Sequence, residues 1–136
     1  MSLFLDASAV IAMLAREPEG ASFSRRVDEE QDSVTSALSI WESTRGLANA
    51  RKISFEEARS IVADYLREFN VRIVPIGADE GELALDAHER FGKGRHRASL
   101  NLGDCFVYAC AKRHAKEILF KGEDFIHTDL KDAMLP

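Results

Sequence analysis

Short apolar runs alternate with longer stretches of helical spacing along this chain. The runs SLFL (2–5), SVT (33–35), VRIVP (71–75) and EILF (117–120) predict strands. Helical patterns lie between them, at about 8–17, 20–30, 37–52, 55–69 and 79–91, and again around Asp104. Strands that alternate with helices in this way predict an α/β sandwich with a mainly parallel central sheet.

Length and composition narrow the class of protein. A chain of 136 residues is long enough for one domain with its own core, and we expect that domain to span 1–136. The net charge of −5 argues against a protein that coats nucleic acid through bulk charge. The apolar N-terminus lacks a basic segment and is interrupted by Asp6, so we expect neither a signal peptide nor a membrane span.

The two cysteines indicate a reducing compartment. Cys105 and Cys110 are five residues apart on one predicted helix, so they point to different faces and are not expected to pair. Free thiols in the core fit a cytoplasmic protein best.

Carboxylates gather where predicted strands end. Asp6 directly follows the first strand, while Glu123 and Asp124 follow the last. Asp104 lies in the first turn of the helix that leads to the last strand, and Glu42 lies early in the helix after SVT. Ligands of parallel sheets bind beyond the carboxyl ends of the strands. Clustered acids without a Cys/His set favour Mg²⁺ or Mn²⁺.

Helix capping is the alternative explanation for each of these acids. The possible caps are Asp6 or Ser8 for the first helix, a Ser39–Glu42 box, an Asn101–Asp104 box, and Asp124 for a short final turn. Caps do not need to be acidic, since Ser, Thr and Asn also serve. The pattern alone therefore leaves capping and metal binding both open.

Four ordered motifs give the chain a family resemblance. FLDASAVIAML, ALSIWES, LNLGDCFVYACAK and ILFKGEDFIHTDL resemble the PIN domain, and more narrowly the VapC toxin ribonucleases of bacterial toxin–antitoxin pairs. The resemblance implies a three-layer α/β/α sandwich and a Mg²⁺-dependent endoribonuclease that leaves a 5′-phosphate. It also implies a homodimer and a small VapB-like antitoxin partner.

The resemblance carries metal-binding acids onto Asp6, Glu42 and Asp104, with a fourth from the GED stretch, and it matches Ser8 to a small hydroxyl residue near the site. The fourth acid is either Glu123 or Asp124. Asp124 precedes Phe125, an apolar residue that can anchor the backbone in the core, whereas Glu123 follows Gly122 and is costlier to order. We expect Asp124 to be the fourth acid and Glu123 to act as a water-mediated helper.

A basic run precedes the Asp104 motif. RFGKGRHR supplies Arg90, Lys93, Arg95 and Arg97, which we expect to contact RNA phosphates. A solvated, flexible loop is the alternative.

Two other functions remain in competition. A phosphatase of the haloacid dehalogenase type would need a second Asp two residues after Asp6, where this chain has Ser8. A non-catalytic binding module with the same fold would have no reason to keep clustered acids. No Cys/His spacing suggests zinc, and no Gly-rich phosphate loop is present.

Overall fold

A central sheet of four parallel strands organises the molecule. The computed structural model describes residues 2–136, in which the strands lie in the order β3-β2-β1-β4. They are β1 (Leu3–Leu5), β2 (Ser33–Ser36), β3 (Arg72–Val74) and β4 (Glu117–Leu119). Leu3 of β1 pairs with Ser33 on one side and with Glu117 on the other. The prediction of an α/β fold with a parallel sheet is confirmed.

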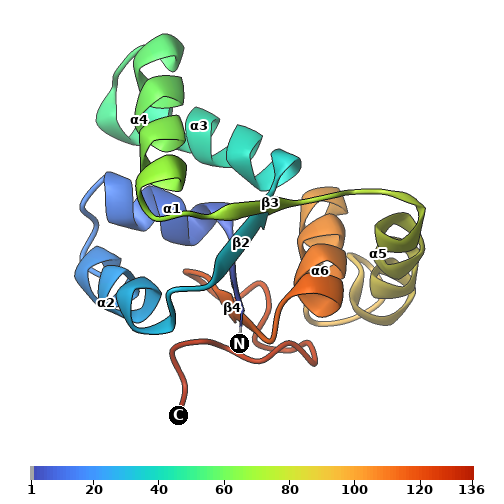
Figure 1. Cartoon of the computed structure of the whole chain (residues 1–136). Helices are drawn as coiled ribbons and strands as arrows, with labels where there is room; N and C mark the ends of the chain where they lie inside the picture. The colour runs from blue at the N-terminus through green and yellow to red at the C-terminus, as the bar shows by residue number, and fades with distance from the viewer. Residues whose placement is uncertain (1) are drawn as a thin grey trace.

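Six helices surround this sheet in the described part of the chain. They are α1 (Ala7–Leu14), α2 (Gly20–Glu30), α3 (Ala37–Arg51), α4 (Phe55–Glu68), α5 (Ala78–Phe91) and α6 (Leu102–His114). Figure 1 shows α5 and α6 on one side of the sheet and α1 and α2 on the other. None of these helices is long and apolar enough to cross a membrane.

Alternating burial along the strands explains the three layers. Phe4 packs into the core beneath α5 and α6, whereas its neighbours Leu3 and Leu5 pack into the core beneath α1 and α2. Successive strand residues point to opposite faces of a sheet. Two apolar faces then require a helical layer on each side. The three-layer α/β/α arrangement implied by the resemblance is therefore confirmed.

The first helix ends earlier than the sequence predicted. We expected it to reach Glu17, but α1 ends at Leu14. Arg16 adopts a left-handed conformation with φ 58°, and the Glu17 N–H donates to the Ala12 carbonyl at 2.9 Å. This closing bond is the Schellman type of helix end, which the apolar spacing does not reveal.

Candidate active site

Asp6 links the first strand to the first helix. It follows β1 and caps α1, because its carboxylate accepts the Ser8 N–H at 3.1 Å and also the Ser8 hydroxyl. Burial raises the pKa of Asp6, the two bonds from Ser8 oppose that rise, and repulsion from Asp124 adds to it. Asp6 is thus a helix cap and, at the same time, a carboxylate placed next to another acid.

Asp104 lies in the first turn of α6 and is part of a complete capping box. Its N–H donates to the Asn101 side chain at 2.8 Å, and its carboxylate accepts the Asn101 N–H at 3.1 Å. Burial, which the Asn101 bond partly offsets, together with repulsion from Asp124 and Asp6 raises the pKa of Asp104 to about 6. A cap alone would favour the charged form, so the raised pKa reflects burial among other acids.

Glu42 is not part of a capping box. Ser36 caps α3 by accepting the Ser39 N–H at 3.2 Å, so the helix begins at Ala37 and the Ser39–Glu42 box is wrong. The error arises because the strand SVT runs directly into the helix through Ser36. Glu42 therefore lies in the second turn, and burial and then repulsion from Asp6 and Asp104 raise its pKa.

Gly103 lets α3 and α6 approach each other at this point. A Cβ atom at Gly103 would lie 3.1 Å from Oε2 of Glu42, which is tighter than an ordinary contact. The glycine next to Asp104 thus makes room for a carboxylate from another helix. The sequence offered only the Gly-Asp pair as a signal, and its partner could not be read without the fold.

Asp124 joins the same group of acids. Its charge raises the pKa of both Asp6 and Asp104, whereas Glu123 affects neither. Phe125 is buried in the core, as expected from its position beside Asp124. Of the two acids in the GED stretch, Asp124 is thus the one whose charge couples to the other carboxylates.

The four acids lie close enough to influence one another's charge, but they do not form a complete metal coordination sphere. Within residues 2–136, no three His, Cys, Asp or Glu side chains stand close enough together to form a complete metal-binding group. The donors fit a hard divalent cation, because they are all oxygens and repel one another in its absence.

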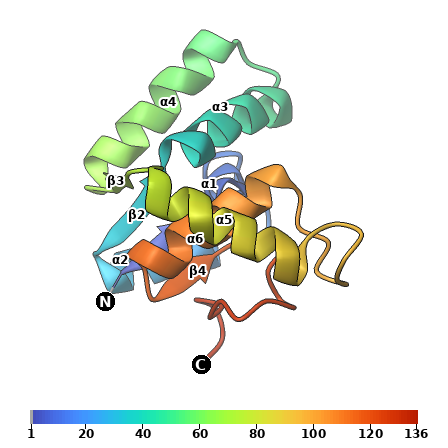
Figure 2. The same cartoon turned by 90° about the vertical axis from the view of Figure 1, so that its right-hand side faces the viewer.

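The basic loop between α5 and α6 folds back on itself. The Lys93 N–H donates to the Leu100 carbonyl at 2.9 Å, and His96 Nδ1 accepts the Ala98 N–H at 3.0 Å. Figure 2 shows this loop, coloured yellow to orange, projecting from the body of the molecule. The loop presents exposed cations at Lys93, Arg95 and Arg97.

Arg90 differs from the other three cations of the basic run. Its guanidinium donates to the Tyr108 hydroxyl at 3.3 Å and pairs with Asp129 at 3.5 Å. It also lies over the Phe91 ring, 4.7 Å from the centroid. Arg90 therefore has partners within the protein that are independent of any RNA.

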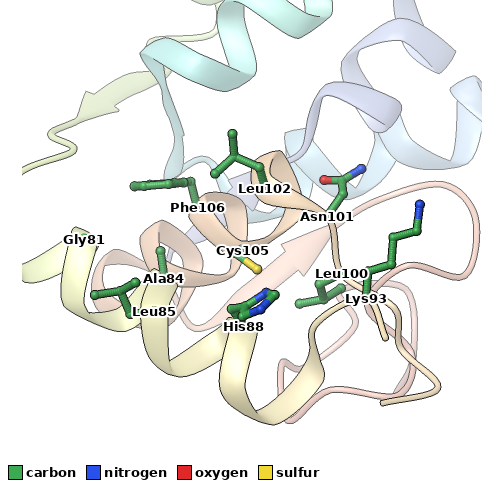
Figure 3. A pocket seen from close by; sticks show the side chains of 10 residues that line it. All are labelled: Gly81, Ala84, Leu85, His88, Lys93, Leu100, Asn101, Leu102, Cys105 and Phe106. Carbon is green, nitrogen blue, oxygen red and sulfur yellow. The ribbon is translucent and has the colours of Figure 1, made fainter. Parts of the chain in front are cut away.

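An apolar face lies beside the acids. A cavity of about 430 Å³ between α5 and α6 is lined by Gly81, Ala84, Leu85, His88, Lys93, Leu100, Asn101, Leu102, Cys105 and Phe106 (Figure 3). A second cavity, of about 450 Å³, is lined by Leu38, Trp41, Glu42, Ile76, Leu102, Gly103 and Phe106. The two cavities share Leu102 and Phe106, so the apolar face continues from α5 past the acids to α3.

Comparison with known proteins identifies the family to which this chain is similar. The family model of the PIN domain matches residues 3–131. Ribonuclease VapC30 of Mycobacterium tuberculosis is 40% identical over 135 residues, which cover 98% of this chain and 100% of the relative. Ribonuclease VapC of Mycolicibacterium smegmatis is 35% identical over 134 residues, with 94% and 97% of the two chains covered.

A solved structure has the same fold. The crystal structure of Mycobacterium tuberculosis VapC20, described as a Sarcin-Ricin loop cleaving toxin, superposes with a TM-score of 0.68 at 20% identity. The match covers 90% of this chain and 92% of that one. The chain belongs to the PIN domain family and, within it, to the VapC ribonucleases.

Proposed function

We propose that this protein is a Mg²⁺-dependent endoribonuclease and the toxin of a VapBC-type pair. The observation that carries the proposal is the placement of acids from separate segments near one another. Burial and the charges of neighbouring acids raise the pKa values of Asp6, Glu42 and Asp104, and Asp124 is one of those neighbours. The VapC relatives support RNA as the substrate and a VapB-like protein as the partner. A cytoplasmic location is consistent with the two free, buried cysteines.

Each acid has a proposed role. Asp6 and Asp104 would hold the ion, and Glu42 and Asp124 would complete its surroundings directly or through water. When bound, Mg²⁺ or Mn²⁺ lowers the pKa of a water ligand and neutralises charge on the phosphate during hydrolysis.

The neighbouring residues orient these carboxylates. Ser8 fixes one oxygen of Asp6, and the Asn101 N–H fixes one oxygen of Asp104. Without a cation, the four acids repel RNA, so the cation must bind before the substrate does.

The basic loop would supply the positive charge that RNA needs outside the site. Lys93, Arg95 and Arg97 are exposed, and the loop that carries them leads through Asn101 directly into α6 and Asp104. Contacts between these cations and phosphates would fix the strand next to the acids. Arg90 is expected to contribute less, because its guanidinium already pairs with Asp129.

An antitoxin and a second copy of the chain are the proposed protein partners. The acid cluster and the net charge of −5 suit a basic antitoxin segment, whose Arg could pair with the carboxylates. The apolar face suits a homodimer, because Leu102 is 77% exposed, Leu85 63% and Trp41 56%. Both cavities described above open on this face.

Cleavage of total RNA tests the enzymatic proposal. Purified protein, freed of any partner, should cut RNA with Mg²⁺ and not with EDTA, and the new 5′ ends can be mapped by sequencing. The Asp104→Asn variant, prepared in the same way, controls for contaminating nucleases. Equal cleavage with and without Mg²⁺ would contradict metal dependence.

Sedimentation tests the dimer separately. A charge placed on the apolar face by Leu102→Glu should convert a dimer to a monomer. Leu135→Glu, a change at a similarly exposed leucine near the C-terminus, should leave the dimer intact. A wild-type protein that sediments as a monomer at all concentrations would contradict this assignment of the face.

A further inference from the structure

Asp129 lies near the end of the segment that carries Asp124, and its carboxylate contacts two residues of α6. The Tyr108 hydroxyl donates to Oδ1 of Asp129 at 2.6 Å, and the Lys112 ammonium lies 2.9 Å from Oδ2. Arg90 adds its charge from the end of α5, at 3.5 Å. The Asp129 carboxylate thus accepts a hydrogen bond from a phenol and pairs with two cations.

The same face of α6 carries the site acid and this anchor. Asp104, Tyr108 and Lys112 are spaced four residues apart, so they lie one above another along the helix. Asp104 at one end belongs to the acid cluster, and the next two residues of the row hold Asp129. A single rigid helix therefore relates the position of Asp104 to that of the segment after β4.

The segment 121–130 is also attached at Lys121 and at Phe125. The Lys121 N–H donates to the Ser8 hydroxyl at 2.9 Å. Phe125 is buried and meets Phe120 edge to face, with 5.4 Å between the ring centroids. Asp124 lies between the attachment at Lys121 and the anchor at Asp129, directly before Phe125.

We infer that Tyr108 and Asp129 are positioning residues, which hold the segment 121–130 against α6 so that the Asp124 carboxylate stays beside Asp104. The inference rests on the proposed function only in treating Asp124 as a site acid. It also gives Arg90 a structural role beside Asp129.

The protonation states suit this arrangement at neutral pH. Burial, the bond to Asp129 and the negative charge of Asp129 raise the pKa of Tyr108 to about 12, so the phenol keeps its proton. Although burial alone would raise the pKa of Asp129, the bonds from Tyr108 and Lys112 lower it. Tyr108 is thus a fixed donor and Asp129 a fixed charged acceptor, and bonds of this charge-assisted kind are the stronger ones.

Tyr108→Phe tests the inference with the smallest change, since it removes the hydroxyl and keeps the ring. Tyr65→Phe is the matched control, because it removes a hydroxyl on α4 that hydrogen-bonds to the Met13 sulfur at 3.4 Å. Backbone hydrogen exchange over 121–127, measured on metal-free protein, should be about tenfold faster in Tyr108→Phe and unchanged in Tyr65→Phe. Unchanged exchange in Tyr108→Phe would overturn the inference.

Mn²⁺ binding, followed by electron paramagnetic resonance, connects the anchor to the acids. Tyr108→Phe should weaken Mn²⁺ binding by about tenfold, as expected for a residue that orients a ligand. Its kcat should fall at low Mg²⁺ and recover at high Mg²⁺, with KM for RNA unchanged. Faster exchange together with wild-type Mn²⁺ affinity would overturn the link to Asp124.

Two further variants separate this inference from the proposed function. Asp129→Asn keeps an acceptor for Tyr108 and should be milder than Asp129→Ala in both measurements. Asp124→Asn should weaken Mn²⁺ binding and leave exchange at wild-type rates. If Asp124→Asn binds Mn²⁺ normally, the fourth acid of the proposed function is wrong, while the exchange rates of Tyr108→Phe still decide whether the anchor exists.

Discussion

Ser8 and Lys121 are joined by a hydrogen bond that ties the first motif of the chain to the last. The Lys121 N–H donates to the Ser8 hydroxyl at 2.9 Å, and the same hydroxyl donates to the Asp6 carboxylate. One side chain therefore orients Asp6 and also attaches the segment that carries Asp124. The Lys121 ammonium pairs instead with Glu17 at 2.9 Å.

Ser8→Ala should reduce RNA cleavage by about tenfold, because Asp6 loses an orienting bond and Lys121 loses its acceptor. Ser8→Thr keeps the hydroxyl and should retain most of the activity. Cleavage rates at a fixed Mg²⁺ concentration measure both effects, and Ser24→Ala on the exposed side of α2 is the control. Equal rates for Ser8→Ala and the wild type would show that this bond has no role in the site.

The fourth acid can be identified by comparing two neighbouring substitutions. Asp124→Asn should lower cleavage more than Glu123→Gln, because only the charge of Asp124 couples to Asp6 and Asp104. The deficit of Asp124→Asn should shrink as Mg²⁺ is raised, if this residue mainly retains the ion. Initial rates over a Mg²⁺ series give the answer, and a larger loss in Glu123→Gln would reverse the two assignments.

The contribution of the basic loop to RNA binding should appear in the salt dependence of the RNA affinity. Replacing Arg95 and Arg97 with Ala removes two exposed cations, so the slope of log Kd for RNA against log salt should fall by about 1.5. Mn²⁺ affinity should not change. Arg25→Ala with Arg51→Ala removes the same charge elsewhere and should leave the slope unaltered. A wild-type slope in the loop variant would exclude these phosphate contacts.

Glu80 should make the protein sensitive to acid. It is almost fully buried between α5 and α6, where it accepts the Gly77 N–H at 2.7 Å and contacts His114 at 2.8 Å and Arg113 at 2.7 Å. The bond from Gly77, followed by that from His114, lowers the pKa of Glu80 to about 2. A carboxyl with a lowered pKa stabilises the fold above its unfolded value near 4.5, and that stabilisation is lost as the pH falls toward 2.

The free energy of unfolding in urea at pH 5 and at pH 3 measures this effect. Glu80→Gln should be less stable than the wild type at pH 5, and the difference should narrow at pH 3. Glu82→Gln, at an exposed position of the same helix, should follow the wild type at both pH values. A constant difference between Glu80→Gln and the wild type would contradict the lowered pKa.

The sequence predicted local structure better than it predicted contacts between distant residues. The helix expected at 55–69 and the four strands were located from apolar spacing, because burial imposes that spacing directly. The helix 37–52 was expected to start at Ala37, as α3 does, but its capping residue was misassigned to Ser39. Ser36 and Ser39 are both serines that could cap a helix, and only the end of β2 decides between them. The proximity of Glu42 to Gly103 and the anchor between Tyr108 and Asp129 depend on the packing of separate helices and loops.

Mg²⁺-dependent cleavage of RNA by the wild type and by Asp104→Asn tests the central claim most directly. Removing this charge relieves repulsion in the acid cluster, so the variant should fold and, in EDTA, melt no lower than the wild type. The wild type should cleave RNA in proportion to bound Mg²⁺, and Asp104→Asn should show no cleavage at the same concentrations. Cleavage by Asp104→Asn at the wild-type rate would contradict a metal site built on these acids.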